Sequence, residues 1–555
     1  MTSIADAGGA THRVTNQSVA LEGHDVFSTD RVLVEALERE GGGWAADRAR
    51  EVGRYAGSPA AIRAGFEANE NPPRLRTHDR FGHRVDEVAF HPAYHELLGA
   101  AVGFGLHSLP WAEPQPGAQV ARAAMFACFS QAEAGVGCPI SMTSSVIPAL
   151  RAEPRLAAEW EPRFTSRSYE PELRPAADKP GALCGMAMTE KQGGSDVRAN
   201  TTSAAPIDGG GPGSGYELSG HKWFCSAPMC DAFLVLAQAP GGLSCFLLPR
   251  FTPGGERNAI NLQRLKDKLG NRSNASSEIE LRGAWAQLVG EEGRGVQTII
   301  EMVNHTRLDC VIGAAAGIRL GTAQAIHHAM NRSAFGRPLV EQPLMRNVLA
   351  DLAIESEAAT IAAMRLARAY DEAAAGDRDA AEFKRLATAV LKYWTCKRAP
   401  AHAAEALECL GGNGYVEESG MPRLLRESPL NGVWEGSGNV QCLDALRAMG
   451  RSPACLEAVM AEIGEAVGAN PALDDAIASL GREFAHGDGL EARARLIVER
   501  TALCLQASLL VRFGDEASAD AFCAGRLADG GLAFGTLPAA TDFGRIIDRA
   551  AVAAD

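Results

Sequence analysis

The feature that most constrains the fold of this 555-residue chain is its hydrophobic period, which changes twice. Up to about Leu183, apolar residues recur at helical spacing between Pro-bearing loops. From Cys184 to about residue 290 the pattern becomes a series of short β-leaning runs, and after Glu292 the helical period returns. We therefore expect an α+β protein in which a β domain lies between two helical parts.

This pattern divides the chain into five expected segments. They are an N-terminal arm (1–40), a helical domain (41–183), a β-barrel or β-sandwich domain (184–290), a four-helix bundle (291–450) and an extra C-terminal helical domain (451–555). The start signal Ser28-Thr29-Asp30 predicts a short helix at the end of the arm. Strands are expected at 201–205, 216–218, 232–239, 243–248, 260–265 and 276–281, and long helices from 296, from 344, at 383–398 and at 401–410.

Composition narrows the classes of function. The net charge of −14 repels a phosphate backbone, so nucleic-acid binding would need a local basic patch. The thirteen cysteines show no C-x-x-C pair or zinc spacing, and no signal segment or run of about 18 apolar residues is visible. We expect a cytoplasmic protein with reduced thiols, no membrane span and no metal. His91 and His95 stand four residues apart, but a structural role is favoured over a metal site.

A candidate catalytic residue stands in the Gly-rich turn from Leu430 to Asn439. Glu435 follows the bulky Trp434 and precedes a segment with helical spacing. A carboxylate on such a turn can act as a general base in a cavity. The alternative is that it compensates a helix dipole.

Two further motifs come from the β segment. The loop Met186 to Val197 contains free backbone N–H groups at its glycines and hydroxyls at Thr189 and Ser195, which suit a polar ring edge or a diphosphate. The run Trp223 to Ser226 joins an aromatic wall to a hydroxyl, which suits an aromatic cofactor. A β-bulge and ordinary core packing are the alternatives.

The order of these motifs resembles the flavin-dependent acyl-CoA dehydrogenase superfamily. The matching stretches are Met188-Thr-Glu-Lys-Gln-Gly-Gly-Ser-Asp-Val197, Lys222-Trp-Phe224, Arg332-Ser-Ala-Phe335-Gly-Arg-Pro-Leu339, Leu410-Gly-Gly-Asn-Gly-Tyr415 and Trp434-Glu-Gly-Ser437. More narrowly, the chain resembles the AidB branch, flavoproteins of the response to DNA alkylation, and the extra C-terminal segment fits that branch.

The resemblance implies a homotetramer that binds FAD between the β domain and the helices. It assigns Met186, Met188, Thr189, Gly194, Ser195, Phe224, Cys225 and Ser226 to the isoalloxazine, with Cys225 where many relatives have Thr. It assigns Asn431, Trp434, Gly436, Ser437 and Asn439 to a turn beside the cofactor. It also implies that Arg332 and Phe335 reach the FAD of a neighbouring subunit, and that Glu408, Gly411 and Gly412 lie near the adenosine diphosphate.

The implied chemistry is α,β-dehydrogenation of a short or branched acyl-CoA. Glu435 aligns with the family's base, and flavin N5 accepts the β-hydrogen as hydride. Thr306 and Arg307 align with substrate-binding positions on a helix where some relatives place the base instead. An AidB-type, DNA-associated flavoprotein with little turnover is the alternative. The region 451–555, however, has nine arginines, no lysine and sixteen acidic residues.

Overall fold

The computed structural model describes residues 11–486, 488–528 and 530–552. The first ten residues of the expected arm lie outside this part. The helix expected at the end of the arm is confirmed as α1 (Arg31–Arg39), and Asp30 caps it by accepting a hydrogen bond from the Leu33 N–H at 3.1 Å. The arm before α1 packs on its own chain, where Asn16 exchanges hydrogen bonds with the backbone of Ser333.

Helices follow α1 up to residue 164. They are η1 (Gly43–Ala45), α2 (Ala46–Ala56), α3 (Pro59–Glu70), α4 (Pro92–Gly103), α5 (Leu109–Ala112), α6 (Ala118–Ala132), α7 (Gly137–Leu150) and α8 (Pro154–Phe164). One prediction is wrong here, because an antiparallel hairpin of β1 (Arg74–His78) and β2 (Arg84–Ala89) interrupts the helices. Its exposed side chains are mostly polar, so the apolar alternation that marks a strand is weak.

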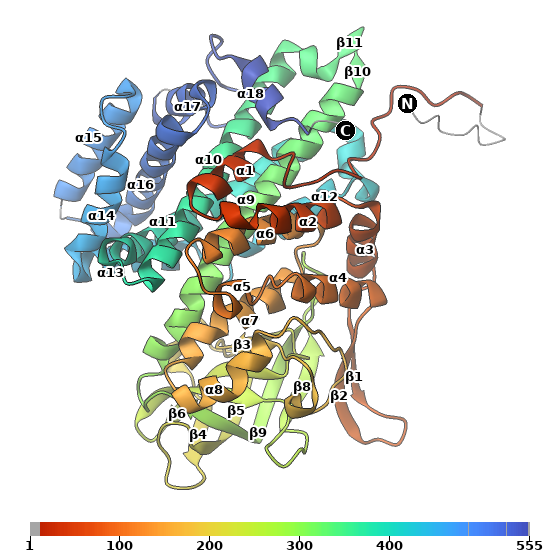
Figure 1. The fold of residues 1–555 in the computed structure, drawn as a ribbon, viewed down its shortest axis with the longest axis vertical. Coiled ribbons are helices and arrows are strands. Elements are labelled where there is room, and N and C mark those ends of the chain that lie inside the picture. The colour runs from red at the N-terminus through yellow and green to blue at the C-terminus, as the bar shows by residue number, and fades with distance from the viewer. Residues whose placement is uncertain (1–10, 487, 529, 553–555) are drawn as a thin grey trace.

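The β domain lies below the helices in Figure 1. Its strands are β3 (Cys184–Ala187), β4 (Ser203–Pro206), β5 (Gly215–Ser226), β6 (Ala232–Ala239), β7 (Gly242–Pro249), β8 (Ile260–Leu265) and β9 (Ser276–Val289). The sheet runs β3-β6-β4-β5-β9-β7, and an additional pairing of β7 with β6 closes it into a barrel. The expected strands at 232–239 and 260–265 are confirmed with the same bounds.

Long helices follow the barrel and form a bundle above it in Figure 1. They are α9 (Gly295–Asn331), α10 (Pro343–Ala374) and α11 (Arg378–Cys409), followed by η5 (Gly411–Tyr415), η6 (Glu417–Ser419), α12 (Met421–Glu427), η7 (Leu430–Gly432) and α13 (Gly438–Arg451). The small hairpin of β10 (Ser333–Ala334) and β11 (Arg337–Pro338) leads through η4 (Leu339–Glu341) into α10. The two helices expected at 383–398 and 401–410 are one helix, which continues through Pro400 because its flanking turns are buried.

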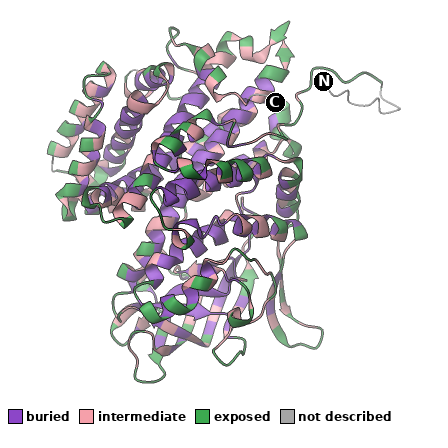
Figure 2. Ribbon diagram, viewed as in Figure 1, coloured by how far each residue is buried: buried purple, intermediate pink, exposed green. Residues whose placement is uncertain are grey.

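The remaining helices pack against this bundle. They are α14 (Pro453–Gly464), α15 (Pro471–Ala485), α16 (Leu490–Phe513), α17 (Glu516–Phe522), the π-helical η8 (Cys523–Leu527) and α18 (Phe543–Ala550). Figure 2 shows buried residues concentrated along the central helices and the barrel, with exposed ones on the outer faces and loops. The α+β class and the helical–β–helical order are therefore confirmed, whereas the exact segment boundaries remain predictions.

Candidate active site

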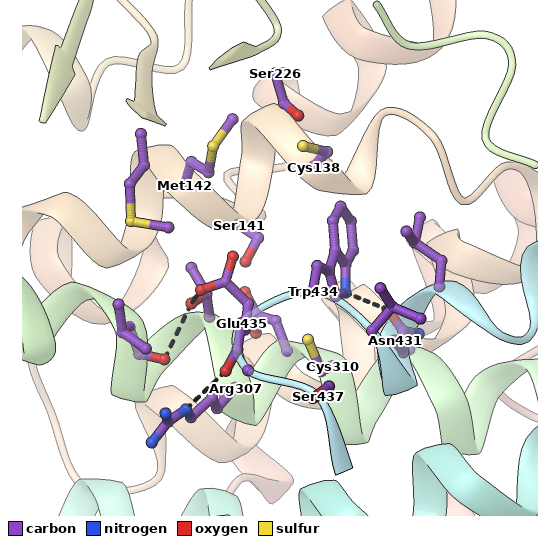
Figure 3. Close-up of a pocket in the computed structure, with 18 of the residues that line it drawn as sticks. Cys138, Ser141, Met142, Ser226, Arg307, Cys310, Asn431, Trp434, Glu435 and Ser437 are labelled. Carbon is purple, nitrogen blue, oxygen red and sulfur yellow. Dashed lines mark hydrogen bonds between the residues drawn. The ribbon is translucent and has the colours of Figure 1, made fainter. Parts of the chain in front are cut away.

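A cavity of about 1280 Å³ lies between the barrel and the long helices. One face of α9 lines it from Val296 past Thr306 to Leu320, so the cavity follows the helix for most of its length. The opposite wall includes Cys138, Ser141 and Met142, which helical spacing places on one face of α7 (Figure 3). The cavity lies between the β domain and the helices, where the family resemblance places the cofactor.

The turn that carries Glu435 enters this cavity from the side of α11 and α13. Glu435 has a φ of +57°, a left-handed conformation that is uncommon outside glycine. Hydrogen bonds from Arg307 Nε and Gln441 Nε2, each 3.0 Å long, hold its carbonyl oxygen. The Lys392 ammonium donates to the carbonyls of Trp434 at 2.6 Å and Gly436 at 2.5 Å. These four bonds hold the turn in its strained conformation.

The carboxylate of Glu435 contacts α9 within the cavity. Thr306 Oγ1 donates a 2.8 Å hydrogen bond to its Oε2. Burial raises the pKa of Glu435, while the Thr306 hydrogen bond and the charges of Lys392 and Arg307 oppose that rise. A carboxylate with a raised pKa, directed into a cavity, fits the role of a general base better than that of a solvent-exposed helix cap.

Most residues predicted from the sequence line this one cavity. They are Met186, Met188, Thr189, Gly194, Ser195, Phe224, Ser226, Thr306, Arg307, Asn431, Trp434, Glu435, Gly436 and Ser437. Cys225 does not, because strand alternation turns its side chain into the barrel core, where it is 1% exposed. Asn439 also lies outside the cavity and accepts a hydrogen bond from Arg495 Nε at 2.8 Å.

A second group of predicted residues lies away from the cavity of its own chain. Arg332 and Phe335 belong to the β10–β11 hairpin at the top of Figure 1, and Phe335 is 100% exposed. Glu408, Gly411 and Gly412 lie at the end of α11 and the start of η5, and all three are exposed. Their expected contacts with another subunit's cofactor stay a prediction.

Sequence reasoning missed the residues that hold the turn and those that close the cavity. Lys392 and Gln441 are buried inside ordinary helical patterns, which give no signal of their bonds to the turn. Lys268, Arg423 and Glu427 line the same cavity and come from a loop and from α12. The only sequence signal that could have identified these three residues as part of the site is their charge within weakly apolar segments.

Comparisons with known proteins agree with this geometry. The chain matches the adaptive response protein AidB N-terminal domain over residues 16–171, the acyl-CoA dehydrogenase middle domain over 185–284 and the acyl-CoA dehydrogenase C-terminal domain over 293–450. It is 45% identical to the acyl-CoA dehydrogenase homologue AidB of Escherichia coli K12 over 489 residues, which cover 86% of this chain and 89% of AidB. The chain belongs to the AidB group of the acyl-CoA dehydrogenase family. Members of this family are FAD-dependent oxidoreductases, as the sequence predicted.

Two solved structures resemble the AidB-type chain along most of its length. Caenorhabditis elegans ACDH-11 in complex with C11-CoA superposes with a TM-score of 0.85 at 27% identity and covers 95% of both chains. The apo-form of Bd2924 has a TM-score of 0.81 at 27% identity and covers 90% of this chain and 99% of its own.

Other groups that the sequence singled out have structural roles in the AidB-type fold. His91 caps α4, and His95 Nδ1 lies 2.7 Å from the Tyr169 hydroxyl. All thirteen cysteines are free and buried. The described residues contain no cluster of three or more metal-ligating side chains, and none of their helices combines the length and apolarity needed to cross a membrane.

The C-terminal arginines are largely neutralised by neighbouring carboxylates. Arg493 and Arg500 lie on one face of α16, but both bond to Glu483, at 2.5 and 2.9 Å. Among the described residues, six of the nine arginines of this region form salt bridges with carboxylates: Arg493, Arg500, Arg512, Arg526, Arg545 and Arg549. Few cations there remain for phosphate contacts.

Proposed function

We propose that this chain is an acyl-CoA dehydrogenase in which Glu435 removes the α-proton of an acyl thioester. The observation that carries the proposal is the position of the Glu435 carboxylate, held by Thr306 in a cavity between barrel and helices. The acyl-CoA substrate is supported by ACDH-11, a relative solved with C11-CoA. The family relationship supports the reaction class.

The residues of the cavity fit FAD. Thr189 and Ser195 offer hydroxyls, and Phe224 and Trp434 offer flat apolar surface on the barrel and helix sides. The loop is close-packed at Gly194, where a Cβ would come within 2.4 Å of Thr189 Oγ1. We assign the isoalloxazine to this region. Bound there, FAD supplies a two-electron acceptor for the β-hydrogen of the substrate.

The protein's own groups then have separate tasks. The Glu435 carboxylate accepts the α-proton, and the raised pKa makes it a stronger base. Thr306 orients the carboxylate, and Arg307 and Lys392 fix the backbone on either side of it. Trp434, whose Nε1 donates to Asn431 Oδ1 at 2.9 Å, keeps water from that side of the site.

Exchange of the α-proton tests this proposal. The FAD-loaded protein, incubated anaerobically with an acyl-CoA in D₂O, is expected to place deuterium at the α-carbon, as mass spectrometry would detect. Glu435→Gln should slow this exchange by roughly 10²- to 10⁴-fold. The matched control is Glu301→Gln, an exposed position on α9. Equal exchange in Glu435→Gln, or a purified protein that takes up no FAD, would refute the proposal.

We also propose a homo-oligomer, with a tetramer as the expectation. Large apolar side chains are strongly exposed near β10, β11, η5 and the start of α10: Phe335, Leu344 and Tyr415. Association with DNA has less support, because salt bridges occupy most C-terminal arginines. A shift assay that detects salt-dependent DNA binding by this chain would reverse that judgement.

A further inference from the structure

The loop after β3, residues 188–195, brings part of the proposed cofactor site into the cavity. Its residues Thr189 and Ser195 line the cavity, whereas Gln192 between them is exposed to solvent. We call this segment the cavity loop. A loop that is open to solvent keeps one conformation only where other parts of the protein hold it.

In the middle of the cavity loop, one charged side chain is fully buried. Lys222 Nζ on β5 donates a 2.8 Å hydrogen bond to Glu190 Oε1, and neither side chain is exposed to solvent. The Lys222 ammonium also donates to the Leu236 carbonyl on β6 at 2.7 Å. Through this ion pair, the cavity loop is attached to two strands of the barrel.

The Glu190 carboxylate also joins the cavity loop to the segment that follows it. Its Oε2 accepts hydrogen bonds from the Thr201 N–H at 2.7 Å and from Gln192 Nε2 at 2.8 Å. Its Oε1 accepts a hydrogen bond from the Thr202 N–H at 3.2 Å. Burial acts to raise the pKa of Glu190, but the hydrogen bonds from Lys222 and the two threonines outweigh burial and lower it. The carboxylate is therefore ionised at neutral pH.

Strand β5 holds the backbone of the cavity loop as well. The N–H of Trp223, the residue after Lys222, donates to the Thr189 carbonyl at 2.8 Å. Asn200 Nδ2 donates to the Met188 carbonyl at 2.9 Å. The position of Thr189 is therefore set by the same strand that carries Lys222.

A buried ion pair contributes little to net stability, because the cost of removing both charges from water offsets much of their attraction. A fixed loop, by contrast, favours a ligand, because binding then need not order the loop. We propose that Glu190 and Lys222 are positioning residues for FAD, which hold the Thr189 and Ser195 hydroxyls where the isoalloxazine binds. The inference rests on the proposed function, which assigns the isoalloxazine to this region, and it names the residues that prepare the site.

Limited digestion of the FAD-free protein with trypsin tests whether the ion pair holds the cavity loop. Lys191, which is exposed in this loop, offers a cleavage site. The double variant Glu190→Met, Lys222→Met leaves no buried charge at the pair. It should be cleaved after Lys191 roughly tenfold faster than wild type, as mass spectrometry of the fragments would show. Gln192→Leu, which removes one bond to the carboxylate, should show a smaller increase. An unchanged rate in the double variant would overturn the inference.

Titration of the same FAD-free proteins with FAD, followed by flavin fluorescence, tests the effect on the cofactor. The double variant should bind FAD roughly ten- to a hundredfold more weakly than wild type. Glu190→Gln combined with Lys222→Met keeps a carbonyl acceptor for the Thr201 and Thr202 N–H groups, and should recover part of the affinity. Equal affinity of wild type and double variant would overturn the inference and leave the proposed function standing. A wild-type protein that binds no FAD would overturn both.

A control separates this effect from a general loss of stability. Arg526 pairs with the buried Asp351 at 2.5 Å, outside the cavity. Arg526→Met should therefore be less stable than wild type but keep the wild-type FAD affinity and the wild-type rate of cleavage after Lys191. If the double variant does not fold, Gln192→Leu takes its place and should weaken FAD binding by roughly two- to fivefold. Wild-type values for Gln192→Leu in both measurements would then overturn the inference.

Discussion

The proposed role of Glu435 as a base depends on a neighbouring hydroxyl and several backbone contacts that fix the residue. The sequence identified the carboxylate, and a family resemblance gave it a role. Its partner Thr306 lies 129 residues earlier in the chain. Sequence spacing cannot show such a contact, because the contact depends on how α9 packs beside the turn.

Thr306→Val tests this contact. The hydroxyl stabilises the ionised form of Glu435, so its removal should raise the pKa of the carboxyl further. Because the base must be ionised, the pH profile of flavin reduction by an acyl-CoA should move to higher pH. Thr306→Ser keeps the hydroxyl and should leave the profile in place. Coincident profiles for the two variants would show that the hydrogen bond has no such effect.

Among the elements, α11 helps to hold the turn that carries Glu435. The Lys392 ammonium satisfies two carbonyls of the turn from the middle of that helix. Lys392→Met should lower the free energy of unfolding by about 1–3 kcal/mol and slow flavin reduction, because the Trp434 carbonyl loses the Lys392 bond and the Gly436 carbonyl keeps only the 3.0 Å bond from Gln441 Nε2. Urea unfolding and stopped-flow absorbance measure the two effects. Lys397→Met, at an exposed position of α11, should change neither.

Much of the element order could be predicted from the sequence, and the exceptions have physical causes. Strands β6 and β8 were predicted with correct bounds because turn residues flank clear β-leaning runs. The β1–β2 hairpin was missed because β1 is mostly polar and β2 lacks a regular alternation of apolar and polar residues. Pro400 suggested a break in α11, but burial of the helix outweighs the local cost.

The site, too, could be predicted only in part from the sequence. The motif in the loop 186–195 predicted one wall of the cavity, and the motif in the turn 431–437 predicted another. The part of the cavity lined by α9, α12 and the loop after β8 was not predictable, because it arises where these elements converge. Cys225 was assigned to the cofactor by alignment, but the sheet turns its side chain into the core.

Over the whole molecule, buried ion pairs join the C-terminal segment to the bundle. Arg526 bonds to Asp351 at 2.5 Å and to Glu355 at 3.0 Å, and both carboxylates are buried in α10. Burial alone would raise the pKa of Glu355, but Arg398 and Arg526 lower it to about 2. The stability from this pair is therefore present at neutral pH and is lost as pH falls toward about 2.

Arg526→Met should accordingly lower the free energy of unfolding by about 3–5 kcal/mol at neutral pH, because it leaves buried carboxylates underpaired. The difference in the free energy of unfolding between wild type and variant should shrink as the pH falls below about 4, where the carboxyl groups of the unfolded chain are protonated. Urea unfolding across pH measures it. Arg545→Met, at an exposed pair with Asp515, should cost no more than about 1 kcal/mol. Similar losses for both variants would contradict the role of Arg526.

The proposed assembly gives a further prediction at this scale. Wild-type protein should have a mass in light scattering well above the 58.5 kDa of one chain. The Phe335 side chain is fully exposed in the single chain and is expected to contact another subunit and its FAD. Phe335→Ser should therefore shift the protein toward smaller species and lower its FAD content. Val467→Ser, at an exposed position of the C-terminal segment, is the control. A wild-type protein that stays at the mass of one chain would contradict the proposal.

We propose above that the carboxylate at position 435 removes a proton from an acyl-CoA beside bound flavin. Anaerobic stopped-flow measurement of flavin reduction, in wild type and in Glu435→Gln with equal FAD content, tests it most directly. We expect the flavin of the wild type to be reduced, and the rate in the variant to be lower by roughly 10²- to 10⁴-fold. Equal rates in the two proteins, or no reduction of wild type by any acyl-CoA, would contradict it.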